Sequence, residues 1–517
     1  MKITRRESIV TGTARVLGSL ESVQPGSLFA ADDEPATRNK SGKVTLLHVN
    51  DVHGYMDLHL EWFAAPQQPA YRQIGGYARI ATIVKQIREE TEGRVLFCDN
   101  GDTFHGTYAV VKTEGEALLP ILNQLGLAAM TVHWDFFYGP AQLQNLASKL
   151  KHPILAINIY DKKGKLFFQP YVMQEVGGLK IATIGIGSNI VDKLYPAEFS
   201  EGIRCTDGLT ELPGFIKEVR GKGADLVVVL SHLGFPQDME LLSKTPGVDV
   251  LISGHTHNRL WQPVKQGGAL LMQSGCHGAF VGRLDLEVQD GKVVSHQHAL
   301  IEVAESIRPD PTMEALVKEA LKPYAAELGR VVGQVSTVLD RDTELEATMD
   351  NFLLASIREL AGTTLAFSNG WRWGAPVLPG PVTQNDVWNI VPWPVPISTA
   401  DLTGRELIEM LEENLERTYS AKPFDQQGGY VKRCHGLKMY IKIENPPGTR
   451  IQDLFIAGER VQPDKTYSTA FLTVQAVPEK YGKNRKNLTQ TAHDAMLAYL
   501  AKHSPASAEL VGSVVAN

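Results

Sequence analysis

The chain has 517 residues, which is long for a single hydrophobic core, so we expect two large domains. Hydrophobic residues make up 43% of it and charged residues 21%, the balance of a globular protein rather than of a disordered or fibrous one. The formal net charge is −7, so composition gives no indication of a protein that binds nucleic acid or an anionic membrane surface.

The four cysteines are too few and too scattered for a disulfide framework. They are Cys98, Cys205, Cys276 and Cys434. Each lies in or beside an apolar run, which favours a buried thiol over a disulfide or a nucleophile.

Residues 1–42 differ from the rest and are predicted to be an export signal with a flexible leader. Arg5 and Arg6 precede a mildly apolar stretch, and Leu28-Phe29-Ala30-Ala31 offers small residues for cleavage. This arrangement resembles a twin-arginine signal, which predicts a periplasmic protein. Arg15 and Glu21 interrupt the apolar stretch, so a disordered tail is the alternative. No other stretch has the roughly eighteen apolar residues of a membrane span.

Residues 43–305 are predicted to form an α/β domain. Short runs rich in β-branched residues recur along this segment and are typical of buried strands. They occupy residues 44–47, 94–97, 154–157, 181–184, 226–230 and 248–252. Amphipathic segments such as residues 76–90 lie between them, which indicates α/β layers. Residues 281–288 alternate apolar and polar side chains, which predicts an edge strand or a strand of a second sheet.

A proline-marked break ends this pattern. Ile307-Arg308-Pro309-Asp310-Pro311 interrupts the alternation, and one long connecting helix is predicted over residues 312–328. We therefore place a connecting helix at residues 306–330 and a C-terminal α+β domain at residues 331–517. That domain is predicted to contain helices at 349–360 and 404–415, with turns rich in Pro and Gly between residues 374 and 396.

Residues that can bind metals gather at the predicted strand ends. Seven polar side chains follow strands in this way: Asp51, His53, Asp102, His133, His232, His255 and His257. In an open α/β sheet, ligands collect in the crevice at the carboxyl ends of the strands, so we expect the seven to share one site. Residues two apart in an extended segment point to the same side, which would aim Asp51 with His53, and His255 with His257, into that crevice.

This set predicts a site for two metal ions. Carboxylate oxygen and imidazole nitrogen suit zinc, iron or manganese, and a carboxylate can bridge two ions. Seven ligands exceed the needs of one ion, whereas two ions can activate water and offset the charge of an anionic substrate. Taken singly, Asp-x-His or a histidine after a strand is a weak signal, and we interpret His48 and His152 as structural. Gly254-His255-Thr256-His257 is more specific, and the ordered series favours a metal centre.

In these motifs the chain resembles the 5′-nucleotidase family of metallophosphoesterases. The resemblance implies a layered sandwich of two sheets flanked by helices, followed by a C-terminal substrate-binding domain. It implies one ion held by Asp51, His53, Asp102 and His257. It implies a second ion held by Asp102, His133, His232 and His255. Asp102 would bridge the ions, and Asp102 and His232 would be the catalytic residues.

Position 133 departs from the ordinary family pattern. Nucleotidases usually have Gly-Asn-His-Glu there, with the Asn as a metal ligand and the His as a catalytic group near the leaving oxygen. His133 and Trp134 replace them, and an indole cannot transfer a proton as histidine does. The run His133-Trp134-Asp135-Phe136, with Tyr138-Gly139 close by, is similar to SoxB, the thiosulfohydrolase branch of the family.

Two C-terminal segments support that resemblance. Residues 368–374, Ser-Asn-Gly-Trp-Arg-Trp-Gly, resemble the Arg-Trp-Gly loop of the branch. Gln426-Gln427-Gly428-Gly429, followed by Lys432 and Arg433, resembles its second substrate-facing loop.

The SoxB resemblance implies a hydrolase that releases sulfate from a cysteine S-sulfonate or S-thiosulfonate on the sulfur-carrier protein SoxYZ. The expected cofactor is a pair of divalent ions, with manganese favoured and zinc or iron as alternatives. The expected substrate-binding residues are Trp134, Tyr138, Asn369, Trp371, Arg372, Trp373 and Arg433. Arg372 is the first candidate for holding sulfone oxygens. Trp134 and Tyr138 would face residues 371–374 across a narrow cleft that admits the carrier arm, and we expect a monomer.

Two alternatives stay open. A periplasmic 5′-nucleotidase or 2′,3′-cyclic-nucleotide phosphodiesterase would need aromatic rings that sandwich a purine. The candidates are Trp371, Trp373, Trp388, Trp393 and Phe424. Alternatively, the loss of the catalytic histidine would mark a non-catalytic binding homologue, although the complete set of metal ligands argues against this interpretation.

Overall fold

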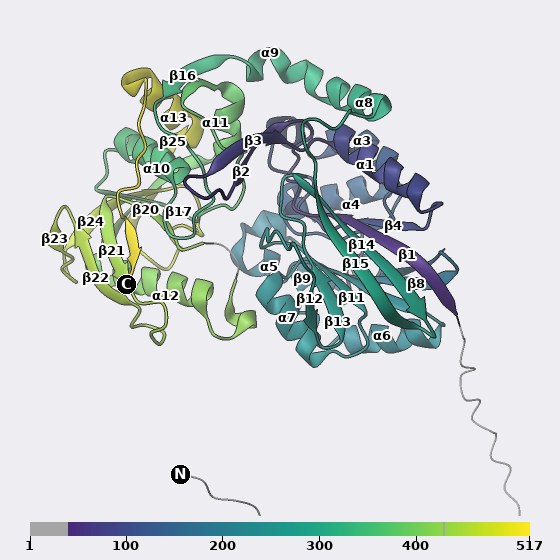
Figure 1. Cartoon of the computed structure of the whole chain (residues 1–517). Helices are drawn as coiled ribbons and strands as arrows, with labels where there is room; N and C mark the ends of the chain where they lie inside the picture. Colours follow the sequence, from purple (N-terminus) through teal and green to yellow (C-terminus); the bar gives the residue numbers. More distant parts are fainter. Residues whose placement is uncertain (1–39, 428–429) are drawn as a thin grey trace, which may run out of the picture. The chain divides into compact units, whose positions relative to one another are not determined.

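The computed structural model describes residues 40–427 and 430–517 (Figure 1). Residues 1–39 of the predicted export signal and leader (residues 1–42) and the pair Gly428-Gly429 lie outside the described residues, whereas Ser41 and Gly42 already belong to a strand of the folded part. Within the described part of the chain, every helix is too short or too polar to cross a lipid bilayer. All four cysteines are buried free thiols.

Two large β-sheets form the N-terminal part. The first sheet has the order β15-β14-β1-β4-β5, with β1 Ser41–Val49, β4 Val95–Asp99, β5 Ala129–Met130, β14 Phe280–Gln289 and β15 Lys292–Glu302. The second has the order β12-β13-β11-β10-β8-β7, with β7 Tyr171–Val176, β8 Leu179–Ile186, β10 Leu226–Ser231, β11 Val250–Ser253, β12 Val264–Gln266 and β13 Ala269–Met272. In the first sheet β1, β4 and β5 run parallel, whereas β14 is antiparallel to both of its neighbours, β1 and β15. In the second sheet the four inner strands run parallel and the two edge strands, β12 and β7, are antiparallel to their neighbours.

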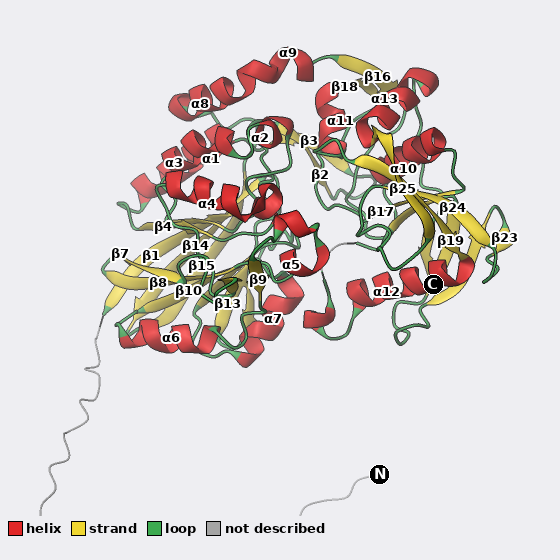
Figure 2. Cartoon of the chain, turned by 180° about the vertical axis from the view of Figure 1, so that it is seen from behind, coloured by secondary structure: helices red, strands yellow, loops and turns green. Residues whose placement is uncertain are grey.

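The two sheets pack face to face and helices cover their outer faces. Leu46 of β1 and Val228 of β10 belong to the apolar layer between the sheets. Leu47 of β1 points the other way, into a core shared with α1 (Tyr77–Glu90), α3 (Leu119–Leu125) and α4 (Gly139–Lys149). The helices α6 (Leu212–Gly221) and α7 (Phe235–Lys244) cover the second sheet (Figure 2). The predicted layered α/β sandwich is confirmed.

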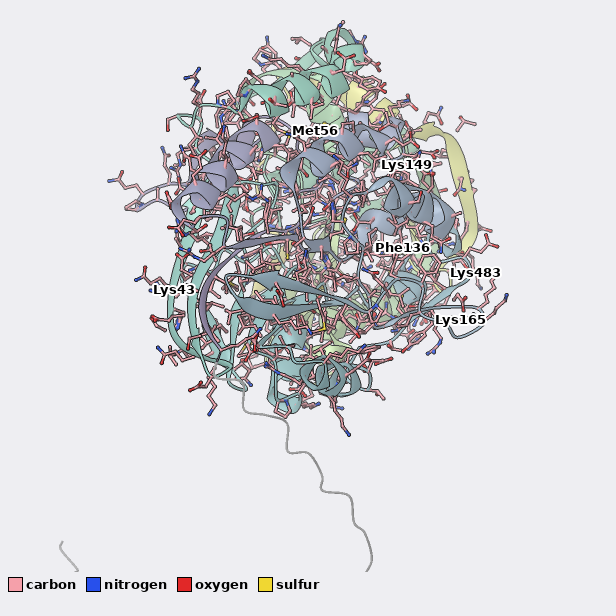
Figure 3. The ribbon with its side chains drawn as sticks, turned by 90° about the vertical axis from the view of Figure 1, so that its right-hand side faces the viewer. Lys43, Met56, Phe136, Lys149, Lys165 and Lys483 are labelled. Atoms are coloured by element: carbon pink, nitrogen blue, oxygen red, sulfur yellow. The ribbon has the colours of Figure 1, made fainter. Side chains whose placement is uncertain are left out.

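Helix α1 shows how the sequence pattern produces this packing. Its buried side chains include Ile80, Ile83, Val84 and Ile87, which recur three to four residues apart and form one face against the first sheet. The same separation of inside and outside holds elsewhere. Figure 3 labels Phe136, which is fully buried, and Lys43, Lys149, Lys165 and Lys483, which are exposed.

The connecting segment is broken, whereas a single helix was expected at residues 312–328. It consists of α8 (Pro311–Leu321), a 3₁₀ turn at Lys322–Tyr324 and α9 (Ala325–Leu328). Pro323 lies in the turn, and a proline has no N–H to donate to the preceding helical turn. Helix α8 begins where the prolines mark it, with Asp310 as its N-cap accepting the Met313 N–H.

The C-terminal part is α+β, as predicted. One sheet has the order β20-β17-β24-β19-β25, with β17 Leu365–Ser368, β19 Pro396–Thr403, β20 Arg433–His435, β24 Thr466–Phe471 and β25 Lys483–Thr491. A second has the order β23-β22-β21-β26, with β21 Leu437–Ile441, β22 Ile451–Ile456, β23 Glu459–Arg460 and β26 Val514–Ala516. The main helices are α10 (Thr348–Ala361), α12 (Gly404–Tyr419) and α13 (Ala492–His503). Capping boxes at Thr403 and Thr491 start the last two.

Other differences from the predicted elements are local. Ile154 and Leu155 form isolated bridges rather than a continuous strand over residues 154–157. Strand β14 is an inner strand, because it pairs with both β1 and β15. Residues 374–396, where turns were expected, contain β18 (Gly380–Thr383) and α11 (Gln384–Ile390). A capping box at Thr383 marks the start of α11.

Gly282 is required where β14 crosses His48. The two residues are partners in the β1–β14 ladder, and a Cβ on Gly282 would lie 1.9 Å from Nε2 of the fully buried His48 ring. We predict that Gly282→Ala lowers the free energy of unfolding by about 1–3 kcal/mol, measured by urea denaturation. His48→Ala in the same chain should restore part of the loss. Gly221→Ala, where a Cβ meets nothing within 4 Å, is the control, and an equal effect of both single variants would contradict the prediction.

Candidate active site

The seven predicted metal ligands all follow strands whose carboxyl ends meet at one place. Asp51 and His53 follow β1, Asp102 follows β4 and His133 follows β5, all in the first sheet. In the second sheet, His232 follows β10, and His255 and His257 follow β11. Six of the seven side chains are buried, and the side chain of His257 is only 10% exposed. The structure therefore brings together all seven residues.

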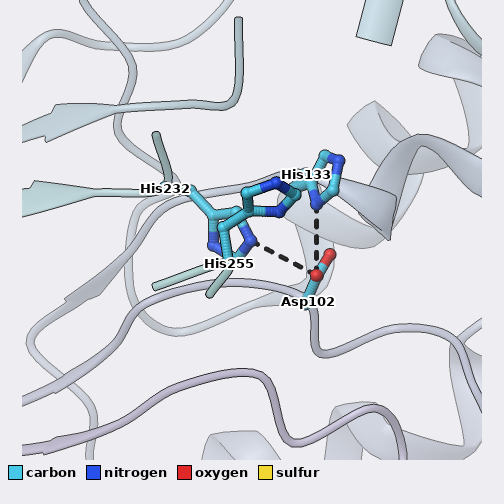
Figure 4. A group of neighbouring side chains, drawn as sticks. All are labelled: Asp102, His133, His232 and His255. Atoms are coloured by element: carbon cyan, nitrogen blue, oxygen red, sulfur yellow. Dashed lines mark hydrogen bonds and ion pairs between the residues drawn. The ribbon is translucent and has the colours of Figure 1, made fainter. Parts of the chain in front are cut away.

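They form two groups that share Asp102. In each group the potential ligand atoms lie within 4.8 Å of one another. The groups are Asp51, His53, Asp102 and His257, and Asp102, His133, His232 and His255. In the second group (Figure 4), Oδ2 of Asp102 lies 3.1 Å from Nδ1 of His133 and 3.2 Å from Nε2 of His232. This is the division that the family resemblance implies.

The backbone reaches this arrangement by an unexpected route. Five of the seven residues have left-handed φ angles: Asp51 at 52°, His53 at 49°, Asp102 at 57°, His255 at 70° and His257 at 56°. The expected extended geometry is therefore wrong for both Asp-x-His and His-x-His. Non-glycine residues adopt positive φ at a cost and gather at functional sites, so these turns are a signature of the site.

The nitrogen atoms fit bound cations. Nδ1 of His257 donates to the carbonyl of Arg372 at 3.1 Å, so Nε2 is the nitrogen that remains to bind a cation. That Nε2 faces Nε2 of His53 at 3.2 Å, and burial lowers the pKa of His53 well below its usual value. One cation between these two nitrogens would satisfy both of them.

The charges around Asp102 also favour cations. Burial alone would raise its pKa, yet the neighbouring His133 and His232 hold the pKa of Asp102 well below its ordinary value. Burial likewise opposes a charge on His232, but Asp102 and Asp51 outweigh it and raise the pKa of His232 to about 10. The carboxylates thus create a strongly negative centre, in which a divalent ion would take over the role of the imidazolium.

Asp135 holds the bridging loop in place. Its carboxylate accepts backbone N–H bonds from Asp102 at 3.0 Å, Thr103 at 2.9 Å, Phe104 at 2.9 Å and His133 at 3.0 Å. It therefore orients two candidate ligands, Asp102 and His133. Residues that hydrogen-bond to metal ligands without binding the metal commonly have this role. Sequence reasoning gave Asp135 no role, although it is the acidic residue of the His-Trp-acidic-Phe run.

A pocket of about 1190 Å³ opens onto both groups. Its wall includes five of the predicted substrate-binding residues, namely Trp134, Asn369, Trp371, Arg372 and Trp373. Trp393, a candidate ring of the nucleotidase alternative, also lines it, as do Phe137 and Tyr195, which the sequence had not assigned to the site. One guanidinium nitrogen of Arg372 lies 3.1 Å from Nε2 of His255. The loop at residues 371–374 therefore reaches the metal ligands directly.

Two family models match the chain. The model of the calcineurin-like phosphoesterase matches residues 44–259, and that of the 5′-nucleotidase C-terminal domain matches residues 331–475. The chain belongs to the 5′-nucleotidase/metallophosphoesterase family. With its two groups of candidate ligands, it is a dinuclear hydrolase of the metallophosphoesterase type.

Named relatives and solved structures agree with this family. The 5′-nucleotidase of Vibrio vulnificus is 25% identical, and the match covers 88% of this chain and 87% of that protein. The trifunctional nucleotide phosphoesterase YfkN of Bacillus subtilis is 25% identical over 85% of this chain, which spans only 32% of that protein. The structure of a Thermus thermophilus sulfate thiohydrolase, SoxB, gives a TM-score of 0.86 at 23% identity, covering 92% of this chain and 97% of that one. A 5′-nucleotidase precursor from Thermus thermophilus gives 0.80 at 22% identity, covering 92% and 99%. At such identities the two structural matches show the fold alone.

Two residues expected to bind substrate do not reach the pocket. The hydroxyl of Tyr138 donates to the carbonyl of Val110 at 3.2 Å, so the ring is turned away from the cleft wall. The buried guanidinium of Arg433 pairs with Asp350 at 3.1 Å and donates to two backbone carbonyls. Its neighbour Lys432 lines the pocket instead, where burial lowers its pKa to about 7.

A third group of possible ligands lies near the first two. His59, Glu61 and His277 are buried and close together. Arg259 pairs with one Glu61 oxygen, while Nδ1 of His277 donates to the other at 3.0 Å. The guanidinium already supplies the positive charge that this carboxylate requires, so the group is a hydrogen-bonded support.

We predict that Asp102→Ala lowers the bound metal from two ions to none, because one carboxylate serves both groups. His257→Ala should mainly remove the first ion. The check is metal content by mass spectrometry after dialysis, with His152→Ala as a control, since His152 is buried outside the site. A variant without Asp102 that kept two ions would rule out the shared carboxylate.

Proposed function

We propose that the chain is a dinuclear sulfohydrolase, which releases sulfate from a cysteine S-sulfonate or S-thiosulfonate on a sulfur-carrier protein of the SoxYZ kind. The proposal includes a periplasmic location after twin-arginine export and two manganese ions. The observation that carries it is Trp134 at the metal centre.

Trp134 is part of the centre and yet cannot transfer a proton. Its backbone N–H donates to Oδ1 of Asp102 at 2.7 Å, and its ring centroid lies 4.4 Å from that of Tyr195 and 5.4 Å from that of Trp373. By the resemblance to the family pattern, the indole stands where related nucleotidases have a proton-donating histidine, and an indole cannot transfer a proton in that way. An alkoxide leaving group needs such a donor. A thiolate is much less basic, because the pKa of a cysteine thiol is only about 8.5. Cleavage of a bond to sulfur thus suits this site better than cleavage of a phosphate ester.

The aromatic rings also leave little room for a purine between them. A base between two parallel rings needs a spacing of about 7 Å, twice the contact distance of carbon atoms. Trp371 and Trp393 are instead nearly perpendicular, with centroids 5.4 Å apart. Trp388 packs on Tyr108 and His493 outside the pocket, and Phe424 packs against the second sheet. These contacts weaken the nucleotide interpretation.

Different groups in the pocket would activate water, bind the sulfone oxygens and accommodate the carrier arm. A bound pair of divalent ions lowers the pKa of water and offsets negative charge on the substrate. Arg372 offers a planar fork of donors for sulfone oxygens, and its position 3.1 Å from His255 puts that fork beside the second group of ligands. The indoles of Trp134, Trp371 and Trp373 offer apolar walls for an extended carrier arm while few side-chain torsions are ordered.

A 5′-nucleotidase activity is the second candidate. The Vibrio vulnificus relative carries that name, and it matches along most of both chains. Identity of 25% is compatible with either substrate, because the metal ligands are common to both interpretations.

Product release from two substrates tests the proposal. We expect the Mn²⁺-loaded protein to release sulfate from an S-sulfonated carrier peptide, and to release phosphate from AMP at least a hundredfold more slowly. Arg372→Ala should lower kcat/KM on the peptide by about tenfold to a hundredfold, the usual effect of losing a charge-assisted hydrogen bond, with metal content unchanged. Arg405→Ala, an exposed site, is the control. Faster turnover of AMP than of the peptide would replace the proposal by the nucleotidase, and no turnover of either would favour a binding homologue.

Trp134→His tests how far the histidine alone restores phosphatase chemistry. We predict at most a tenfold rise in AMP hydrolysis, because the pocket is packed around an indole and His133 still replaces the usual asparagine. The measurement is phosphate release at saturating Mn²⁺. A rise approaching the hundredfold or more that general acid catalysis commonly supplies would show that the C-terminal domain already accepts nucleotides.

A further inference from the structure

Tyr195 places a hydroxyl group at the metal centre from a loop that the sequence did not single out. It follows the short helix α5 (Val191–Leu194) and lines the pocket. Its hydroxyl lies 2.7 Å from Nε2 of His133, and its ring packs on Trp134 with centroids 4.4 Å apart. The ring and the hydroxyl are thus both held in place.

The tautomer of His133 decides which way the hydroxyl points. Nδ1 of His133 lies 3.1 Å from Oδ2 of Asp102, the atom that His232 also approaches, so Nδ1 is the nitrogen aimed at the cation position. With Nδ1 as a ligand, the proton is on Nε2 and is donated to the oxygen of Tyr195. The hydroxyl hydrogen is then available for an acceptor in the pocket.

Tyr195 and Arg372 contact two neighbouring imidazole rings, those of His133 and His255. The hydroxyl of Tyr195 lies 2.7 Å from Nε2 of His133, and a guanidinium nitrogen of Arg372 lies 3.1 Å from Nε2 of His255. The centroids of these two imidazoles are 4.7 Å apart, with planes at 85°. Two hydrogen-bond donors from different loops therefore lie beside two candidate ligands of one group, and both line the pocket in which an anion would bind.

We propose that Tyr195 is a substrate-binding residue whose hydroxyl donates a hydrogen bond to an oxygen of the bound sulfonate, as a second anion-holding group beside Arg372. The identity of the anion rests on the proposed function, whereas the hydrogen bond to a tetrahedral oxyanion does not. At neutral pH a tyrosine hydroxyl remains protonated and keeps its donor, since its ordinary pKa is about 10.

Sulfate, the expected product, is the direct probe. Tyr195→Phe keeps the ring on Trp134 and removes only the hydroxyl, so we expect the Kd of sulfate for the Mn²⁺-saturated protein to rise at least tenfold by calorimetry. Tyr108→Phe is the matched control, because this buried tyrosine donates its hydroxyl to Glu327 outside the pocket. A Kd within twofold of the parent protein, with both ions present, would overturn the proposal.

Metal binding gives a second readout that needs no substrate. If the hydroxyl orients His133, Tyr195→Phe should weaken the binding of one of the two ions by about tenfold to a hundredfold in a Mn²⁺ titration, and leave the other unchanged. Unchanged binding of both ions would contradict the orienting contact. Failure of the carrier peptide as a substrate would overturn the proposed function alone, because weaker sulfate binding by the variant would still show the hydrogen bond.

Discussion

The structure depends on a backbone constraint after the ends of three strands. Asp51 and His255 are the second residues after β1 and β11, Asp102 is the third residue after β4, and all three have a positive φ. His53 and His257, two residues further on, also have a positive φ. Each such residue costs of the order of 1–3 kcal/mol, which the two packed sheets must offset. Glycines complete the fit: a Cβ on Gly254 would lie 2.8 Å from Nδ1 of His232. The rigid sandwich is therefore a precondition for the site, because isolated loops would relax.

Electrostatics couple this geometry to the metal ions. Buried carboxylates and neutral imidazoles at distances near 3 Å repel one another or compete for protons unless cations are present. Asp102 is the centre of this arrangement, and Asp135 fixes its loop through backbone N–H groups. Metal binding and the folded conformation of these loops consequently stabilise each other, as in other metal sites formed by folding.

Sequence reasoning recovered the parts of the site that local patterns encode. Hydrophobic runs gave the strands, and polar residues after them gave the seven ligands, because parallel strands bring their carboxyl ends together. The sequence patterns did not predict side-chain positions that depend on residues far apart in the chain. Arg433 is drawn to Asp350, far along the chain, and Tyr138 is turned by its 3₁₀ segment towards Val110. Tyr195 had no pattern to mark it, since a buried partner such as His133 becomes visible only in three dimensions.

The choice of substrate depends on fewer residues than the choice of fold. The metal groups and the two-sheet sandwich are what the family models recognise, and a sulfonate and a phosphate are both tetrahedral oxyanions that such a centre can hold. Discrimination must therefore arise where the two substrates differ, at the leaving atom and at the group attached to it. Trp134 and residues 371–373 line the pocket that opens onto the candidate ligands. A change of one proton-donating ring to an indole can redirect the chemistry while leaving overall identity to nucleotidases almost untouched.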